Sequence, residues 1–327
     1  MIRRREFITL LGAAGAAWPV GAKAQARLVI GVLDSRARVA AIEDRLRALR
    51  QSLSDAGYEE GKNLAVEYRW GQNQLDRLPE LARELVSVGV SVIVTSSHEA
   101  AFAAKTATAS IPVVFIAAED PVRLGLVTSL ARPTSNLTGV NFLGNELTGK
   151  RLDLLRQLLP TANRVAILVS PASVTNTQIT TRDAEAVAPA MGLHMQFVNA
   201  DNIDQIDAAF ASLERDRPDA LYVDLLPFFS SRRVQIVQLA SKLRLPAIYG
   251  QRQFAEAGGL ISYGADISDA WRQAGTYAAH ILKGVKVAEL PVIQSSKFEF
   301  IINLATARAL GLTVPPTFLA RADEVIE

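Results

Sequence analysis

The chain has no cysteine, only three histidines, and none of the short motifs that commonly identify α/β enzymes. The lack of cysteine excludes disulfides, thiolate nucleophiles, cysteine-ligated metals and an anchor on a lipid-modified cysteine. No G-x-G-x-x-G follows the first apolar run, and no G-x-x-x-x-G-K-[ST], G-x-S-x-G or H-E-x-x-H occurs. These absences predict a protein that is not an enzyme and has neither a cofactor nor a metal site.

Charge is almost balanced along most of the chain. The sequence has 35 lysine and arginine residues against 33 aspartate and glutamate residues. Four of the basic residues, but only one acidic residue, lie in the first 24 positions, so the rest carries almost no net charge. Without a strongly basic surface we expect no nucleic-acid partner.

Beyond the first 24 residues, no apolar run approaches the roughly 20 residues that a membrane-spanning helix needs.

The N-terminus has the pattern of an export signal. Three arginines at positions 3–5 precede an apolar stretch over 7–20, and the small-residue motif Ala22-Lys23-Ala24 follows. This order predicts a secretory signal peptide over residues 1–24, cleaved near Ala24, and a periplasmic location. The arginine-rich start is similar to a twin-arginine (Tat) signal, and an ordinary Sec signal is the alternative.

Beyond the predicted signal, short apolar runs alternate with amphipathic stretches, and the same order occurs twice. Such runs are typical of buried parallel strands, and apolar residues at i, i+3 and i+7 are typical of helices. In the first half, strands are predicted over 28–33, 64–70, 91–95, 112–116 and 137–142, with helices over 40–56, 75–88 and 99–109. In the second half, strands are predicted over 165–169, 194–198, 220–223, 246–249 and 259–263, with helices over 180–191, 206–215 and 232–243. The tail is predicted as a helix over 269–284, an extended segment over 291–300 and a helix over 305–310.

The repeat predicts an α/β fold of two doubly wound parallel-sheet lobes joined by a hinge. About 300 residues are more than one hydrophobic core usually serves, and strands that alternate with helices form parallel sheets. We expect one lobe to contain residues 27–140 and about 265–293, and the other residues 141–264 and about 294–327. Ligands of such sheets bind beyond the carboxyl ends of the strands, so the two lobes would face one cleft.

Seven stretches carry a resemblance to a known family. They are residues 3–11, 57–70, 120–140, 150–160, 227–233, 254–264 and 309–327. Together they resemble the periplasmic binding proteins of the ABC-type substrate-binding family that includes tryptophan- and tyrosine-binding members. The resemblance implies a type I periplasmic-binding fold that closes like a Venus flytrap, and a monomer. It also implies that the chain binds a small solute and delivers it to the membrane subunits of an ABC permease.

Two loops depart from the family pattern. The loop over Asp34–Val39 is charged, whereas the family usually has serine and glycine there, and His98-Glu99 stands where small residues are common. The resemblance therefore implies a small solute and does not fix it as an aromatic amino acid.

Candidate ligand-binding residues follow the predicted strands. In the first lobe these are Ser35, Ser96, Ser97 and Glu119. Ser96 and Ser97 precede a helix whose free backbone N–H groups can bind an acidic group, although Ser97 can equally serve only as the N-cap. Glu119 can face a ligand amine or solvent. An acid-binding helix start with carboxylates opposite suggests an amino-acid-like solute.

In the second lobe the candidates are Asn176, Asp224 and Tyr249. Asp224 follows an apolar strand and can bind a cationic group or form a turn before Pro227. Tyr249 ends a strand and can stack on a planar ligand or belong to the edge of the core.

Two other functions use the same fold. A periplasmic sensing module for a receptor or kinase would have the same cleft and the same sequence features. An α/β enzyme would need a carboxylate mechanism built on Glu119 and Asp224, which no motif indicates.

Overall fold

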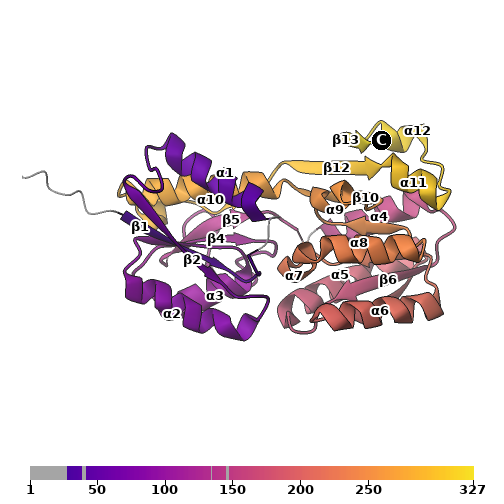
Figure 1. Ribbon diagram of the computed structural model, residues 1–327, viewed down its shortest axis with the longest axis horizontal. Helices are drawn as coiled ribbons and strands as arrows, with labels where there is room; N and C mark the ends of the chain where they lie inside the picture. The colour runs from indigo at the N-terminus through magenta and orange to yellow at the C-terminus, as the bar shows by residue number, and fades with distance from the viewer. Residues whose placement is uncertain (1–27, 39–41, 134, 145–146) are drawn as a thin grey trace, which may run out of the picture.

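The chain folds into two lobes that lie side by side (Figure 1). The computed structural model describes residues 28–38, 42–133, 135–144 and 147–327. The predicted signal peptide and its cleavage site lie outside these residues. Each lobe is a mostly parallel sheet with helices on both faces, which confirms the predicted two-lobed α/β fold. Within the described ranges, no helix combines the length and apolar character needed to cross a bilayer.

The first sheet has the strand order β11-β5-β4-β3-β1-β2, and every neighbouring pair is parallel. Its strands are β1 (Leu28–Asp34), β2 (Leu64–Trp70), β3 (Val92–Thr95), β4 (Val113–Ala117), β5 (Leu137–Asn141) and β11 (Ile293–Gln294). Helices α1 (Glu43–Asp55) and α10 (Ile267–Leu282) cover one face. The turn η2 (Leu75–Arg77) leads into α2 (Leu78–Val88), which covers the other face together with α3 (His98–Ala107).

The continuous apolar runs of the central strands follow from burial on both faces. In β4, Val114 and Ile116 pack in the cluster under α1 and α10, whereas Val113 and Phe115 pack in the cluster under α2 and α3. Successive side chains of a strand point to opposite faces, so a strand covered on both sides favours apolar residues at nearly every position.

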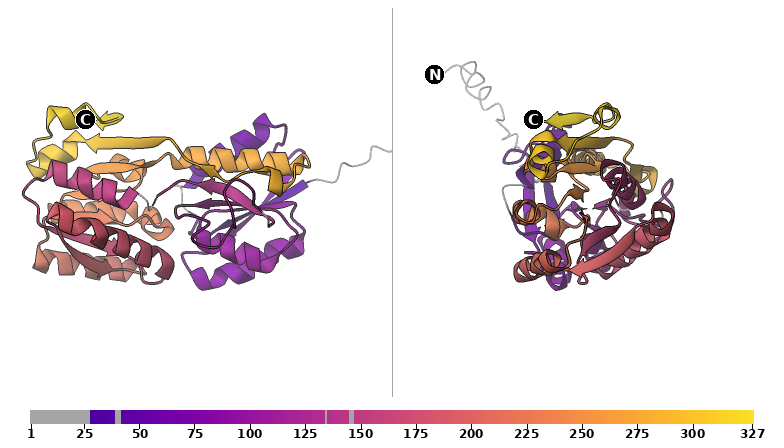
Figure 2. Two further views of the ribbon diagram at one scale, coloured as in Figure 1. Left: turned by 180° about the vertical axis from the view of Figure 1, so that it is seen from behind. Right: turned by 90° about the vertical axis from the view of Figure 1, so that its right-hand side faces the viewer.

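Helix α10 comes from the tail of the sequence but packs on the first lobe, beside α1 (Figure 2). Trp271 of α10 is buried in the same cluster as Leu46 and Leu49 of α1. A Cβ atom at Gly275 would lie 2.1 Å from Ser52 Oγ and 2.8 Å from the Leu49 carbonyl oxygen. Only glycine therefore permits the two helices to approach this closely.

The second sheet has the strand order β13-β12-β10-β9-β8-β6-β7. Its strands are β6 (Arg164–Val169), β7 (His194–Asn199), β8 (Ala220–Val223), β9 (Ala247–Tyr249), β10 (Ile261–Ala265), β12 (Phe298–Asn303) and β13 (Glu324–Ile326). Helices α4 (Thr148–Leu158), α5 (Val174–Met191), α11 (Leu304–Leu310) and α12 (Pro316–Leu319) pack on one face. Helices α6 (Ile203–Asp216), α7 (Pro227–Ser231), α8 (Arg233–Lys242) and α9 (Arg252–Glu256) pack on the other.

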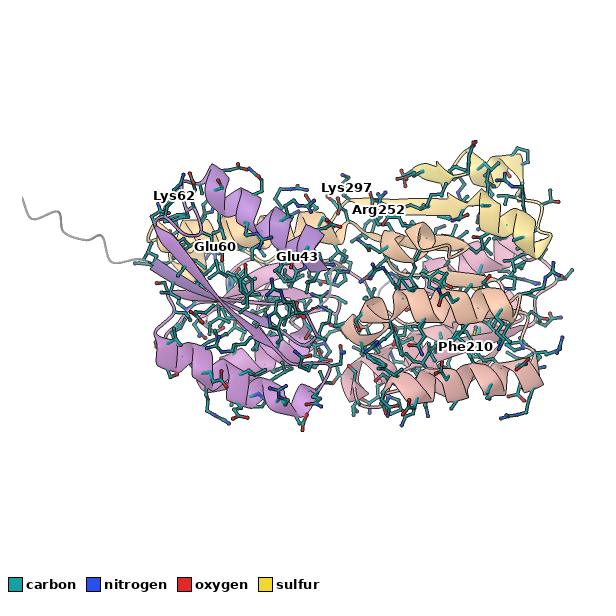
Figure 3. All side chains as sticks on the ribbon, in the orientation of Figure 1. Glu43, Glu60, Lys62, Phe210, Arg252 and Lys297 are labelled. Carbon is teal, nitrogen blue, oxygen red and sulfur yellow. The ribbon has the colours of Figure 1, made fainter. Side chains whose placement is uncertain are left out.

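The C-terminal strands depart from the predicted repeat. Strand β12 enters from the first lobe, after the short turn η4 (Val287–Glu289) and β11, and it is therefore antiparallel to β10. Arg252 of α9, labelled in Figure 3, bonds to Glu256 at 2.8 Å, Glu299 of β12 at 3.0 Å and Glu324 of β13 at 2.7 Å. These ion pairs attach the last segment of the chain to the second lobe.

Several helices and strands differ from the sequence-based prediction, and the short helices α9 and α12 are among those that were not predicted. Helix α5 begins at Val174 and not at residue 180, because its first turns carry polar side chains that bond inside the lobe rather than an apolar stripe. Helix α4 and strand β13 were not predicted, because neither completes a strand–helix unit of the repeat.

The chain passes between the two sheets three times, after β5, after β10 and after β11. Arg151 of α4 lies fully buried beneath two of these crossings. Its Nη1 donates to the Gly144 carbonyl oxygen at 2.8 Å, and its Nε donates to the Tyr263 carbonyl oxygen at 2.7 Å. Nη1 also donates to Tyr222 Oη at 3.1 Å. One guanidinium group thus holds both crossings against the second lobe.

Replacing this guanidinium should destabilise the fold. We expect Arg151→Met to lower the free energy of unfolding by at least about 3 kcal/mol, because two buried carbonyl groups lose their donor. Urea denaturation measures the change. The neighbouring Lys150→Met removes a half-exposed cation that pairs with Asp153 at 3.2 Å, and should change stability by less than about 1 kcal/mol. Equal effects of the two substitutions would contradict this role of Arg151.

Candidate functional site

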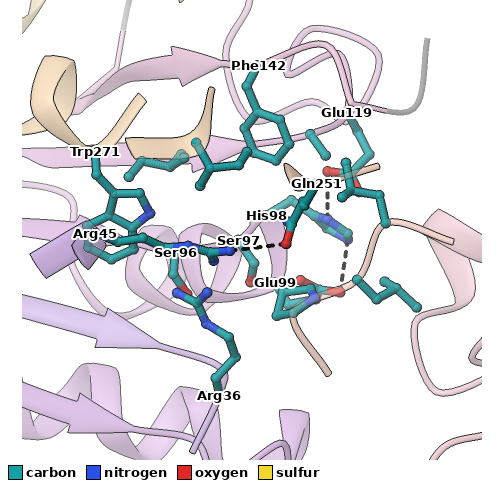
Figure 4. Close-up of a pocket in the computed structure, with 16 residues that line it drawn as sticks. Arg36, Arg45, Ser96, Ser97, His98, Glu99, Glu119, Phe142, Gln251 and Trp271 are labelled. Atoms are coloured by element: carbon teal, nitrogen blue, oxygen red, sulfur yellow. Dashed lines mark hydrogen bonds and ion pairs between the residues drawn. The ribbon is translucent and has the colours of Figure 1, made fainter. Parts of the chain in front are cut away.

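A cleft lined by both charged and apolar residues lies between the lobes, where the carboxyl ends of the central strands of both sheets meet (Figure 4). Its main part, called here the first chamber, has an empty volume of about 480 Å³ including its open mouth. Residues after β1, β3 and β4 line it from the first lobe, with the first turn of α1 and the start of α10. The segments after β8 and β9 line it from the second lobe. Its position agrees with the general rule for ligand binding by parallel sheets.

A histidine between two glutamates forms one side of the first chamber. His98 Nδ1 lies 3.0 Å from Glu119 Oε2, and His98 Nε2 lies 3.5 Å from Glu99 Oε1 (Figure 4). Burial by itself would lower the pKa of His98, but the charges of Glu119 and Glu99 outweigh it and raise that pKa to about 9. The imidazole is therefore charged at neutral pH, and the three groups together carry one net negative charge.

Glu99 also links the two lobes. The hydroxyl of Ser173, from the second lobe, donates a 2.6 Å hydrogen bond to Glu99 Oε1. Burial of Glu99 opposes its ionisation, but the charge of His98 and the bond from Ser173 lower the pKa of this carboxyl. The carboxylate is thus held ionised at the contact between the lobes.

Two arginines and a tryptophan form another side of the first chamber. Arg36 makes a bidentate bond to Asp34, with Nε–Oδ1 at 2.8 Å and Nη2–Oδ2 at 2.5 Å. The same guanidinium lies 5.9 Å from the ring centroid of Trp271. Arg45 of α1 donates from Nη2 to Gln251 Oε1 of the second lobe at 3.1 Å. Phe142, after β5, adds a second aromatic wall.

A second chamber adjoins the first and shares Glu99, Leu226 and Pro227 with it. Its empty volume is about 400 Å³. Ser35 and Asn73 line it from the first lobe, and their side chains each contain a buried oxygen without a hydrogen-bond partner. The whole cleft is therefore longer than the first chamber alone.

The cleft brings four of the seven predicted ligand-binding residues together. Ser96, Ser97 and Glu119 line the first chamber, and Ser35 lines the second. Ser97 is also the N-cap of α3, since its Oγ accepts a 3.3 Å hydrogen bond from the Ala100 backbone N–H. Ligand contact and capping are thus both available to this side chain.

Asn176 and Asp224 lie inside the second lobe and line neither chamber. Asp224 accepts hydrogen bonds from Asn176 Nδ2 at 2.6 Å, Thr180 Oγ1 at 2.9 Å and the Leu225 backbone N–H at 2.7 Å. Burial raises the pKa of Asp224 to about 7, against the effect of these bonds. Asp224 therefore holds the start of the segment after β8, whose residues Leu225–Pro227 line the first chamber. Its own carboxylate does not face the cleft.

Tyr249 is also a core residue rather than a wall of the cleft. It is 1% exposed, and its ring stacks on Phe254 with 4.6 Å between the ring centroids. Tyr249 ends a strand beside the cleft, but its ring points into the core of the second lobe and not into the cleft.

Sequence reasoning missed several residues of the first chamber. They are Arg36, Arg45, Glu99, Gln251, Trp271 and Phe142. The charged loop after β1 was the available signal for Arg36. Arg45 occupies an ordinary position in an amphipathic helix, and Trp271 comes from a tail helix that is distant in sequence. Over the described ranges, no cluster of three or more His, Cys, Asp or Glu residues could hold a metal ion.

Comparison with known proteins adds the following similarities. The family model described as ABC transporter substrate binding protein matches residues 38–326. The "Tyrosine-binding protein" of Clostridioides difficile is 28% identical over 263 residues, which cover 80% of this chain and 75% of that protein. A conserved domain protein from Vibrio cholerae has a TM-score of 0.83 at 25% identity, covering 91% of this chain and 99% of that chain. The ABC domain from Streptococcus pneumonia in complex with L-Trp has a TM-score of 0.81 at 24% identity, covering 92% and 100%.

The charged histidine makes stability depend on pH. The pKa of His98 is about 9 in the folded protein and about 6.5 for an ordinary histidine, so its contribution is complete below pH 6.5 and disappears as the pH rises through 9. We expect the wild type to lose on the order of 3 kcal/mol across this window, and His98→Gln to lose much less. Urea unfolding at a series of pH values measures both. The exposed His194→Gln should retain the wild-type profile, and a flat wild-type profile would refute the assignment.

Proposed function

Because this chain belongs to the ABC transporter substrate-binding protein family, we propose that it captures one small solute between its lobes and delivers it to the membrane subunits of an importer. The family and the named relatives are binding proteins and not enzymes. The fold is the type I fold of periplasmic binding proteins. The observation that carries the proposal is the cleft at the carboxyl ends of both sheets, which is enclosed by two lobes that three crossings of the chain connect.

The proposal includes export. The charged residues 3–5, the apolar stretch over 7–20 and the motif at 22–24 support secretion to the periplasm with cleavage near Ala24, either by the Tat or by the Sec route. Transfer to a permease requires this location. We also propose that the protein acts as a monomer.

The division into lobes is part of the same proposal. We assign residues 27–140 and about 265–293 to the first lobe, and residues 141–264 and about 294–327 to the second. The membership of β11 in the first sheet and of β12 in the second supports this division. Closure of the two lobes around a solute is the movement that such a hinge allows.

The charges of the first chamber support an amino-acid-like solute with a planar side chain. The excess negative charge of the Glu99–His98–Glu119 group suits an ammonium group. The start of α3, with Ser96 and Ser97, suits a carboxylate. Trp271 and Phe142 offer flat apolar walls for a ring. The names of two similar proteins, one for tyrosine binding and one in complex with L-Trp, are consistent with this solute class.

Titration with matched solutes tests the proposal. We expect L-tryptophan or L-tyrosine to raise the melting temperature of the protein and to remain chemically unchanged. A ligand at about 100 times its dissociation constant raises the free energy of unfolding by about 2.7 kcal/mol.

Calorimetric titration with L-tryptophan and its amine-free analogue indole-3-propionate isolates the role of the ammonium group. Wild type should prefer the amino acid by roughly tenfold or more, and Glu119→Gln should lose most of this preference.

The exposed Glu80→Gln on α2 serves as the matched control and should bind as the wild type does. Turnover of the solute would reject a pure binding function. An equal affinity of wild type for the two analogues would reject the ammonium assignment.

A further inference from the structure

A small cavity adjoins the first chamber on the side of α1 and holds three guanidinium groups. Its empty volume is about 280 Å³ with the open solvent at its mouth included, and it shares Arg36, Arg45 and Gln251 with the first chamber. Arg233, at the start of α8, faces it from the second lobe together with Ser230. Arg36, Arg45 and Arg233 are called the arginine cluster below. The cluster is built from both lobes, so it exists only when they are together.

The carboxylates near the cluster do not pair with Arg45 or Arg233. Asp34 is bonded to Arg36 through both of its oxygens. The half-buried Glu43 and the exposed Asp44, on the first turn of α1, pair with other arginines of their own lobe. Among the described residues, no carboxylate lies within 4.0 Å of a nitrogen of Arg45 or Arg233. The cluster thus contains two positive charges without an anionic partner.

The lack of an anionic partner is least favourable for Arg45, because it is the more deeply buried of the two unpaired arginines. Its side chain is nearly enclosed, with the residue 7% exposed, and its Nε has no hydrogen-bond partner. The bond from Nη2 to Gln251 is to a neutral amide oxygen, which also accepts a 2.7 Å bond from Ser230 Oγ. Burial and the neighbouring charges of Arg36 and Arg233 lower the pKa of Arg45, and Asp34 only partly opposes this. A buried, uncompensated cation is unfavourable until an anion joins it.

The N-terminus of α8 lies at the cluster with no acidic residue in its first turn, whereas Glu43 and Asp44 offset the dipole at the start of α1. Arg45 lies in the first turn of α1, and Arg233 is the first residue of α8. A cation in the first turn opposes the helix dipole, and the N-caps of both helices form no side-chain hydrogen bond. Guanidinium groups at a helix N-terminus are common recognition elements for an oxyanion.

We propose that Arg45 and Arg233 form an oxyanion subsite across the two lobes, with Arg36 as its third wall. The subsite takes a carboxylate, phosphate or sulfate group beside the first chamber. Its source is either an acidic side group of the solute, additional to an α-carboxylate, or a free inorganic anion. The first source rests on the proposed function, whereas the subsite itself does not. Because the two arginines belong to different lobes, the anion would stabilise the closed arrangement.

Inorganic phosphate alone is the direct probe. At constant ionic strength, replacing chloride by phosphate should raise the melting temperature of the full mature chain by several degrees at saturating concentration. Arg45→Gln and Arg233→Gln should each lose most of this response. Arg47→Gln is the matched control on α1, because its 73% exposed side chain pairs with Asp44 and should leave the response unchanged. Absence of a phosphate response in wild type, or an equal response in all variants, overturns the proposal.

A second measurement separates ligand binding from a structural role. Without phosphate, Arg45→Gln should melt at or above the wild-type temperature, because the substitution removes an unpaired buried charge. If Arg45 were structural, its loss would lower the melting temperature and leave the phosphate response in place, and that result overturns the proposal.

Paired solutes then identify the source of the anion. Calorimetry compares L-phenylalanine with 4-carboxy-L-phenylalanine, which differ only in one acidic group. If the solute supplies the anion, the acidic analogue binds roughly tenfold or more tightly, phosphate competes with it, and Arg45→Gln removes the difference. If the anion is free, phosphate strengthens the binding of L-phenylalanine instead. Since phosphate alone reports on the subsite, failure of every amino acid to bind would count against the proposed function only.

Discussion

The constraint on which the molecule depends is that both parallel sheets present their carboxyl ends to the same narrow space. A parallel strand buried on both faces favours apolar side chains along its length, so charged residues collect where the strands end. The three crossings of the chain after β5, β10 and β11 then bring the carboxyl ends of the two sheets together. Arg151 holds two of these crossings through its bonds to main-chain carbonyl oxygens. Cleft, hinge and candidate ligand contacts all follow from this arrangement.

Polar groups enclosed in such a space must satisfy one another or be satisfied by a ligand. The cleft shows both situations. His98 is compensated by its two glutamates, and Arg36 is compensated by Asp34. Arg45 has only the neutral amide of Gln251. The compensated groups define the shape and charge of the walls, whereas the uncompensated guanidinium defines where an additional negative charge would be most favourable.

Family membership indicates the general role of the chain, whereas the cleft residues determine which solute fits. The match over residues 38–326 assigns the chain to substrate-binding proteins, whose common feature is the two-lobed scaffold. Residues of the charged loop after β1 and the His98-Glu99 pair line the cleft. The role thus follows from the scaffold, and the choice of solute follows from the residues that the strands and helices place between the lobes.

The sequence by itself determined the order of strands and helices, the two-lobed architecture and the strand ends that approach the cleft, because burial and periodicity are local properties. For this reason it placed Ser96, Ser97 and Glu119 after strand ends, and in the structure all three line the first chamber. It could not show that Tyr249 and Asp224 turn into the second lobe, since a side chain's direction after a strand depends on its packing partners. Nor could it place Trp271 beside Arg36 or Arg45 opposite Gln251. Those pairs are separated by some two hundred residues in the chain, and only the closing of one lobe on the other and the return of the tail bring them into contact.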